Sequence, residues 1–259
     1  MKISIVTITY NNFSELKLTL DSIPNYDFVE SVVINGGDCN ETRELLKSYK
    51  GKSISEKDNG IADAFNKGIK IASGDLIMFL NSGDVLINPN YIKEGIKILK
   101  ESPGYSFVHS NILYKDAFGD ILLMKPKVKN IARGIKYLHP SMIVRSKIFN
   151  TIGSFNPVYK IAMDYDFILR MEKGGFVGFY LDSSPVVQMG GMGISHTSEY
   201  SGIKECARSL QENNYLTIKN IWGLSVRVIL FFCRQVFLII GGKSFLRKLK
   251  WMKYNTMQL

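Results

Sequence analysis

The sequence predicts an α/β protein built on a mostly parallel, doubly wound sheet, followed by a helical extension. Short apolar segments rich in β-branched residues alternate with segments of helical periodicity through the N-terminal half, as in βαβ units. Polar clusters follow several of these apolar segments, at the strand ends where such sheets bind ligands. The 259 residues are 46% hydrophobic and 22% charged, which fits one catalytic domain of residues 1–218 with an appendage of residues 219–259.

The first elements are buried strands that alternate with helices. Ile3–Thr9 is short and almost continuously apolar, as a buried parallel strand is, and Ser14 is expected to cap the following helix. The next expected elements, in order, are a strand at Val29–Ile34, a helix containing Leu45 and Leu46, a helix at Ile61–Ala72 and a strand at Leu76–Leu80.

The pattern becomes less regular after Asp84. Strands are expected at Phe107–Asp116 and Ile121–Val128, as an antiparallel excursion, and a short one at Ser141–Arg145. Further helices are expected at Tyr91–Leu99, Asp164–Lys173 and Lys204–Asn220.

The net charge of +10 belongs mainly to the tail. From Lys219 to the end there are eight basic residues and no Asp or Glu, so residues 1–218 carry only +2. This asymmetry favours an anionic partner for the tail. Three scattered cysteines without metal-ligand spacing, and an N-terminus that enters a strand at once, predict a cytoplasmic protein.

The tail contains a strongly apolar segment, Val226–Ile240, which Arg227 and Arg234 interrupt. Its uninterrupted stretches are shorter than the roughly 20 residues of a spanning helix. A helix lying in the membrane interface is therefore expected, with Lys243–Lys253 reaching the headgroups. The alternative is a helix packed on the catalytic domain with a solvated basic end.

Five polar clusters carry the candidate chemistry, although turns and surfaces use the same residue types. In the third cluster, Asp63 shares a helix face with Asn66 or Lys67, which lie three and four residues further on. In the fourth, Asp84 offers a carboxylate to a hard cation that a diphosphate also binds. In the fifth, Asp164 is either a helix stabiliser or a general base. The clusters are Thr9–Asn12, Asn35–Asp38, Ser55–Gly68, Leu80–Asp84 and Met163–Asp166.

Taken in order, the clusters resemble glycosyltransferase family 2 from Ile3 to about His196. The most specific segments are Glu56–Gly68, similar to the family's E-x-D-x-G-I-x-D-A-x-N-K-G, and Leu76–Asp84, similar to F-L-N-x-x-D. Further matches are His139–Ser141 with Gly153–Phe155 and Asp164–Asp166, and a G-G-x-S-like loop at Met189–Ser195. The LNSGD segment resembles bacterial colanic acid, O-antigen and exopolysaccharide transferases.

The resemblance implies a GT-A fold (a Rossmann-like sheet flanked by helices), a nucleotide-diphosphate sugar donor, and Mn²⁺ or Mg²⁺. It places the catalytic base at Asp164 and the metal ligand at Asp84, with His196 as a further candidate. On the acceptor side it places His139, Ser141, Asp166 and Arg170, the last two supporting the helix of the base. Along the donor it places Thr9, Tyr10, Asn11, Asn35, Asp58, Asp63, Lys67, Asn81 and Ser82.

Two departures from the family pattern affect the expected ligands. The loop Asn81–Asp84 has one carboxylate where the family has several, and Asn35 replaces a base-binding aspartate, which leaves UDP and GDP open.

The expected function is inverting sugar transfer to a polyprenyl-linked oligosaccharide, in O-antigen, capsule or exopolysaccharide synthesis. The enzyme would lie on the inner face of the plasma membrane, with its tail on anionic lipids. An alternative is a nucleotide-sugar-binding module without transfer. An oxidoreductase would need G-x-G-x-x-G after the first strand, which Thr9–Asn12 lacks. No nucleic-acid partner is expected, because the apolar run Val228–Cys233 suits lipid better.

Overall fold

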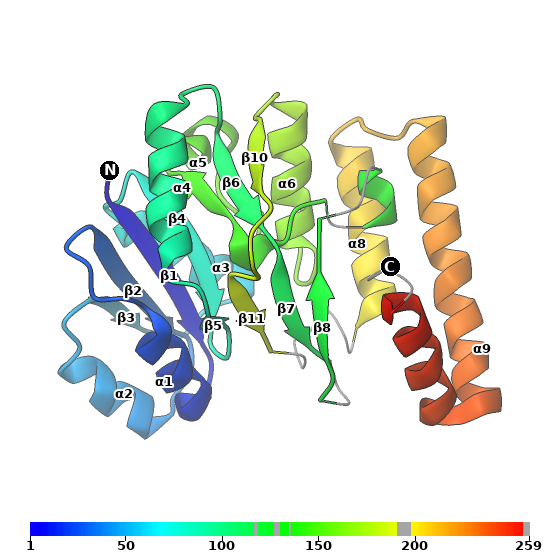
Figure 1. Ribbon diagram of the computed structural model, residues 1–259, viewed down its shortest axis with the longest axis horizontal. Coiled ribbons are helices and arrows are strands. Elements are labelled where there is room, and N and C mark those ends of the chain that lie inside the picture. The colour runs from blue at the N-terminus through cyan, green and yellow to red at the C-terminus, as the bar shows by residue number, and fades with distance from the viewer. Residues whose placement is uncertain (117–118, 127–129, 135, 191–197, 256–259) are drawn as a thin grey trace.

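A seven-stranded sheet forms the centre of the computed structural model, which describes residues 1–116, 119–126, 130–134, 136–190 and 198–255. Its strand order is β10-β6-β9-β4-β1-β2-β3, and β9 runs antiparallel to both neighbours while the other paired strands run parallel. A four-stranded sheet of order β5-β11-β7-β8 lies beside it. Figure 1 shows α1 and α2 near one end of the molecule and the pair α8 and α9 at the other.

The elements of the central sheet are short strands joined by helices. The central strands are β1 (Ile3–Thr9), β2 (Val29–Asn35), β3 (Lys52–Ser55), β4 (Leu76–Asn81), β6 (Phe107–Ser110), β9 (Ile143–Arg145) and β10 (Gly178–Leu181). The second sheet contains β5 (Val85–Leu86), β7 (Ile112–Lys115), β8 (Ile121–Met124) and β11 (Val187–Met189). The helices are α1 (Phe13–Ser22), α2 (Asn40–Lys47), α3 (Ile61–Ile71), α4 (Asn90–Glu101), α5 (Lys147–Ile152), α6 (Met163–Lys173), α8 (Glu199–Glu212) and α9 (Ile218–Asn255), with 3-10 turns η1 (Ile131–Arg133) and η2 (His139–Ser141).

The core has two parts because successive side chains of a strand point to opposite faces. Val6 of β1 packs with Phe65 of α3 on one face, whereas Ile5 packs with Tyr91 of α4 on the other. Phe65 and Tyr91 are fully buried, and a buried aromatic side chain of this size stabilises a fold by about 2–3 kcal/mol. Gly68 lets α3 approach β1, since a Cβ there would overlap the side chain of Val6.

The parallel register brings the carboxyl ends of neighbouring strands to one edge. Thr9, the last residue of β1, pairs with Asn35 of β2, and Ile8 pairs with Asn81 of β4. The polar segments that follow these strands therefore emerge side by side, as expected for a ligand site in such a sheet.

Several predicted elements are confirmed, and others are wrong in detail. The strand Ile3–Thr9 and the predicted helix beginning at Ile61 are present, and the mixed α/β sheet is as predicted. Asn12, and not Ser14, caps α1, because its Oδ1 accepts a hydrogen bond from the N–H of Glu15 at 3.4 Å.

Three predicted boundaries also differ from the structure. Phe107–Asp116 is divided into β6 and β7, which belong to different sheets. The helix predicted at Lys204–Asn220 is present only as far as Glu212, where α8 ends, and the chain turns at Asn214 with φ 53° before α9 begins. The strand predicted at Ile121–Val128 ends at Met124, and Val128 lies outside the described residues.

The C-terminal helix α9 lies against α8 and η1 along one of its faces. Its segment Ile218–Phe237 is long and apolar enough to cross a membrane, despite Arg227 and Arg234. The two arginines that interrupt the apolar segment therefore do not exclude a membrane-spanning helix, contrary to the expectation from the sequence. Length and composition alone do not distinguish a span from a helix on the protein surface. The division of the chain at residue 218 stays a prediction.

Candidate active site

The loops that follow β1, β2 and β4 are hydrogen-bonded to one another. Oδ1 of Asn11 accepts from the backbone N–H of Asp38 at 2.8 Å and of Cys39 at 3.1 Å. Asn11 is in the left-handed region with φ 51°, a conformation that asparagine tolerates better than most residues. The hydroxyl of Ser82 donates to the carbonyl of Asn12 at 3.3 Å. These contacts fix three loops into one surface at the edge of the sheet.

The Gly-Gly turn after β2 is held by the buried side chain of Asn35. Its Nδ2 donates to Oγ of Ser55 at 2.9 Å and to the carbonyl of Gly37 at 3.2 Å, and its Oδ1 accepts from the N–H of Gly37 at 3.1 Å. A Cβ on Gly36 would overlap the carboxylate of Asp58. Glycine at position 36 therefore allows the carboxylate of Asp58, beyond β3, to lie directly against the turn.

The predicted donor residues around the start of α3 form a charged cluster. Oδ1 of Asp58 accepts from the N–H of Gly60 at 2.9 Å, and Oδ2 of Asp63 accepts from the N–H of Asn59 at 2.9 Å. Nζ of Lys67 lies 3.0 Å from Glu56 and 3.6 Å from Asp63. These bonds stiffen the segment, while its contact with a donor stays a prediction.

Two residues at the end of β1 face different environments. Thr9 is buried, and its Oγ1 has no hydrogen-bond partner among the residues that the structure describes. Tyr10 is 69% exposed, so its aromatic side chain is available for stacking on a nucleotide base.

Asp84 lies in the loop after β4 and is only 3% exposed. Its Oδ2 accepts from the N–H of Asn81 at 2.9 Å. Burial raises the pKa of Asp84 to about 7, against the backbone hydrogen bonds that lower it, and the negative charge of Glu15 raises it further. Like charges that share a site favour the protonated form of one of them.

Sequence reasoning missed Glu15, which brings a second carboxylate to this loop from the first turn of α1. A Cβ on Gly83 would lie 3.0 Å from its Oε2, and the carbonyl of Glu15 accepts from the N–H of Gly83 at 3.3 Å. The available signal was its position three residues after the cap Asn12, which places a glutamate in the first turn.

These residues fit a divalent cation that a diphosphate also binds. Hard cations prefer several oxygen ligands, and a cation relieves the repulsion between Asp84 and Glu15. The Oδ1 atom of Asn81 is buried without a hydrogen-bond partner in the described part of the chain, so it is a third available oxygen. Within that part there is no group of three acidic, histidine or cysteine residues able to hold a metal alone. His196 lies outside the described residues.

Asp164 lies in the first turn of α6 and is partly buried. Its Oδ1 accepts from the N–H of Tyr165 at 2.7 Å. Burial raises the pKa of Asp164 to about 6, although the backbone hydrogen bonds and the charge of Arg227 lower it. A carboxylate with a pKa slightly below neutrality suits a general base, because it is ionised yet basic enough to take a proton.

The segment before α6 is joined to the donor side of the site. Nζ of Lys160 donates to the carbonyl of Asn59 at 3.0 Å. Further along, the amide of Asn66 on α3 exchanges two hydrogen bonds with the backbone of Phe155, at 2.8 and 2.9 Å. The structure thus brings the third predicted cluster and the Asp164 region together, although they are far apart in the sequence.

Asp166 and Arg170 join α6 to its neighbours. Oδ2 of Asp166 accepts from Nε of Arg170 at 2.8 Å, and its Oδ1 accepts from the hydroxyl of Ser209 on α8 at 2.8 Å. The guanidinium of Arg170 also donates to the carbonyls of Ile152 and Ser154. Both charged groups are thus used to hold α6 in position, and their contact with an acceptor stays a prediction.

His139 and Ser141 lie in the core at η2. The ring of His139 stacks on Phe79 with centroids 5.3 Å apart, and burial lowers its pKa to about 4, so it is neutral near pH 7. The hydroxyl of Ser141 donates to the carbonyl of Leu138 at 2.7 Å and accepts from the N–H of Ser110 at 3.1 Å. These contacts hold both side chains in the core, and a direct role beside the acceptor stays a prediction.

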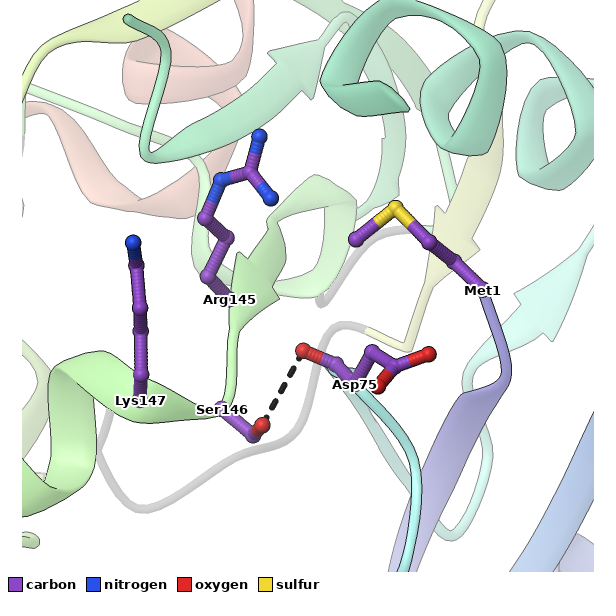
Figure 2. Close-up of a pocket in the computed structure, with 5 residues that line it drawn as sticks. All are labelled: Met1, Asp75, Arg145, Ser146 and Lys147. Atoms are coloured by element: carbon purple, nitrogen blue, oxygen red, sulfur yellow. Dashed lines mark hydrogen bonds between the residues drawn. The ribbon is translucent and has the colours of Figure 1, made fainter. Parts of the chain in front are cut away.

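A hollow of about 220 Å³ is lined by Met1, Asp75, Arg145, Ser146 and Lys147, and Figure 2 shows how these five residues lie around it. The hydroxyl of Ser146 donates to the carbonyl of Asp75 at 3.0 Å across it. The hollow lies at the amino ends of β1 and β4, and therefore at the edge of the sheet opposite the polar loops. It contains none of the predicted site residues.

Comparison with known proteins identifies a family over most of the chain. Residues 4–166 match Glycosyl transferase family 2. A PGL/p-HBAD biosynthesis glycosyltransferase of Mycobacterium bovis BCG is 28% identical over 185 residues, which cover 64% of this chain and 68% of that protein. A glycosyltransferase of Methanocaldococcus jannaschii is 28% identical over 186 residues, covering 65% of this chain and 63% of that protein.

Solved structures share the fold at low sequence identity. S. aureus TarS 1–349 in complex with UDP-GlcNAc has a TM-score of 0.64 at 18% identity, covering 88% of this chain and 72% of that chain. The mannosyltransferase PcManGT of Pyrobaculum calidifontis, in complex with GDP-Man and Mn²⁺, has a TM-score of 0.62 at 13% identity, covering 99% and 84%. These similarities confirm the predicted fold.

Proposed function

Because this chain belongs to glycosyl transferase family 2 and is a glycosyltransferase, we propose that it moves a sugar from a nucleotide-diphosphate donor to an acceptor hydroxyl, with inversion. The observation that carries this proposal is Asp164, a partly buried carboxylate whose segment is joined to the donor-side loop through Lys160 and Asn59. Solved proteins of the same fold bind UDP-GlcNAc or GDP-Man, which supports a nucleotide-sugar donor and leaves UDP and GDP both open.

In the proposed reaction, Asp164 takes the proton of the acceptor hydroxyl as its oxygen attacks the anomeric carbon. The bond from that carbon to the diphosphate breaks, and attack from the opposite side inverts the configuration. When bound at Asp84, Glu15 and Asn81, Mn²⁺ or Mg²⁺ would supply positive charge to the departing diphosphate. The proposed donor site comprises Thr9, Tyr10, Asn11, Asn35, Asp58, Asp63, Lys67, Asn81 and Ser82.

The substitution Asp164→Asn tests this role. Loss of a general base typically lowers a rate by about 10²–10⁴-fold, so transfer should fall by that factor while donor binding remains. Donor binding is measured by the thermal shift with a panel of UDP-, GDP- and dTDP-sugars and Mn²⁺, because a bound ligand stabilises the fold by mass action. Asp21→Asn is the control, since Asp21 is exposed on α1. Full transfer by Asp164→Asn would remove this residue from the role.

We further propose a lipid-linked oligosaccharide acceptor, polyprenyl-linked and used in surface polysaccharide synthesis. The support is α9, which turns a row of apolar side chains away from the protein body and continues into a basic segment. Ile218 is 89% exposed and Trp222 66%, and Ile229, Phe232 and Val236 continue the same helix face. Such a face suits the inner surface of the plasma membrane, where anionic lipids attract basic residues.

Sedimentation with vesicles containing anionic lipid tests the membrane role. The double variant Trp222→Ser, Phe232→Ser should lose binding, because it removes two large apolar groups from the outward face. Leu18→Ser on α1, which replaces an exposed apolar residue elsewhere, should bind as the wild type does. Equal binding by all three proteins would contradict a docking role for this face.

A further inference from the structure

The helix pair α8 and α9 contacts the segment that carries the base. Glu205 of α8 accepts from the backbone N–H groups of Lys160 at 3.0 Å, Ile161 at 2.8 Å and Ala162 at 2.8 Å. These are the three residues immediately before α6, and the last of them, Ala162, is its N-cap. Glu205 therefore holds the start of the helix on which Asp164 lies.

An arginine of the tail helix reaches the same junction. Arg227 is partly buried, and its Nη1 donates to Sγ of Cys206 on α8 at 3.3 Å. Its positive charge lowers the pKa of Cys206 and of Asp164, in both cases against burial, which raises them. The guanidinium thus lies where α6, α8 and α9 meet, within electrostatic range of the proposed base.

The side of α9 on which Arg227 lies separates two explanations for this residue. A helix that only docks on lipid gains from arginines that reach the headgroups. Arg227 instead points toward the protein, as does Arg234 two turns later, which pairs with Glu199. The exposed residues Trp222 and Phe232 lie on the opposite side of the helix. One face of α9 is therefore free for lipid, while the other places the guanidinium of Arg227 against α8.

We propose that Arg227 is a positioning residue for transfer, whose guanidinium, placed at Cys206 where α8 and α9 meet, keeps the Asp164 carboxylate ionised and able to accept the acceptor's proton. The proposal rests on the proposed role of Asp164. The charged and titratable groups around that carboxylate are Arg227 from α9, Cys206 and Glu205 from α8, and Tyr165 on its own helix. Arg227 is the cation of this set, so its removal changes the charge state most directly. The tail helix is then part of the active site as well as a candidate anchor.

The pH dependence of transfer tests this role in the full-length protein. Arg227→Met keeps the aliphatic stem without the charge, and it should move the acidic limb of the profile upward by about half to one pH unit. The rate at pH 6 then falls roughly two- to fivefold more than the rate at pH 8. Arg227→Lys keeps the positive charge, so its acidic limb should lie close to that of the wild type. Arg234→Met removes an arginine that pairs with Glu199 away from Asp164, so it should not move the acidic limb.

A second measurement does not depend on activity. The gain in stability from Asp164→Asn at pH 8 should be larger in the Arg227→Met background than in the wild type, because the unpaired carboxylate is then costlier to ionise. An unmoved acidic limb in an active Arg227→Met protein, or equal gains in the two backgrounds, would overturn the role of Arg227. Absence of transfer by the wild type with every donor would instead contradict the proposed function.

Discussion

Replacing Asp164 by asparagine should stabilise the protein at high pH while it removes activity. Burial raises the pKa of Asp164 to about 6 from the ordinary 3.8, so the folded state resists ionisation that the unfolded state allows. Below about pH 4 the carboxyl is protonated in both the folded and the unfolded state, and its full contribution to the free energy of unfolding is present. That contribution is lost as the pH rises through 6, the pKa of the folded state. At 1.36 kcal/mol per pH unit, the ionised carboxylate costs about 3 kcal/mol at pH 8, and less where water reaches it.

Asparagine has nearly the same shape and never ionises. Its Oδ1 accepts the hydrogen bond that the N–H of Tyr165 now gives to Asp164 at 2.7 Å. The free energy of unfolding of the variant should therefore exceed that of the wild type by about 2–3 kcal/mol at pH 8, and by close to zero at pH 4. For a chain of this size that gain corresponds to roughly 4–12 °C in Tm.

The assay is urea unfolding of both proteins at pH values from 4 to 8, without donor. Other carboxylates titrate over this range in both proteins, and the difference between the two curves cancels them. Asp21→Asn serves as a control, because the carboxylate of Asp21 is 63% exposed and should give no pH-dependent difference. A difference that is constant with pH, or a variant that is less stable at pH 8, would refute the reasoning.

Three further predictions concern the donor side and the core. The affinity for Mn²⁺ in the presence of a nucleoside diphosphate should rise with pH through about 7, because the cation has to displace the proton of Asp84. Calorimetric titration measures this affinity, and the variant Asp84→Asn should bind Mn²⁺ weakly at every pH. Gly36→Ala should abolish the thermal shift caused by the donor, since its Cβ overlaps Asp58; a normal shift would show that the turn has room. Gly68→Ala should lower the free energy of unfolding by roughly 1–3 kcal/mol, because the added Cβ overlaps Val6. In the control Gly104→Ala the Cβ meets nothing within 4 Å, and the free energy of unfolding should change by less than about 0.5 kcal/mol.

The sequence predicted the elements whose burial is continuous. β1 is rich in β-branched apolar residues and almost wholly buried, so its pattern admits few other interpretations. The edge strand β3, Lys52–Ser55, is mostly exposed and polar, and its pairing with β2 depends on the neighbouring strand more than on its own side chains. The same holds for the two-residue strand β5. Such strands are set by tertiary contacts, which the local pattern does not contain.

The candidate site was predictable to the extent that it follows the strand ends. Parallel register requires the loops after β1, β2 and β4 to meet, and polar residues in those loops are visible in the sequence. Glu15, Glu205 and Arg227 were not predicted, because each reaches the site from a helix whose placement the local sequence does not give. Arg227 also had a sufficient local explanation, as a basic residue of an interfacial helix.

The pKa values of both Asp84 and Asp164 are raised, but Asp84 has a negatively charged neighbour and Asp164 a positively charged one. This difference supports their separate proposed roles. Asp84 lies near Glu15, whose charge adds to the effect of burial, so at pH 7 about half of its population holds a proton until a cation replaces it. Asp164 lies near Arg227, whose charge opposes burial, so most of its population is ionised at the same pH. A group that is neutral without a cation suits binding that cation, and a group that is ionised but weakly acidic suits accepting a proton. Removing the charge of each neighbour should therefore shift the two properties in opposite directions: Glu15→Gln should lower the pH at which Mn²⁺ binds, whereas Arg227→Met should raise the pH at which transfer begins.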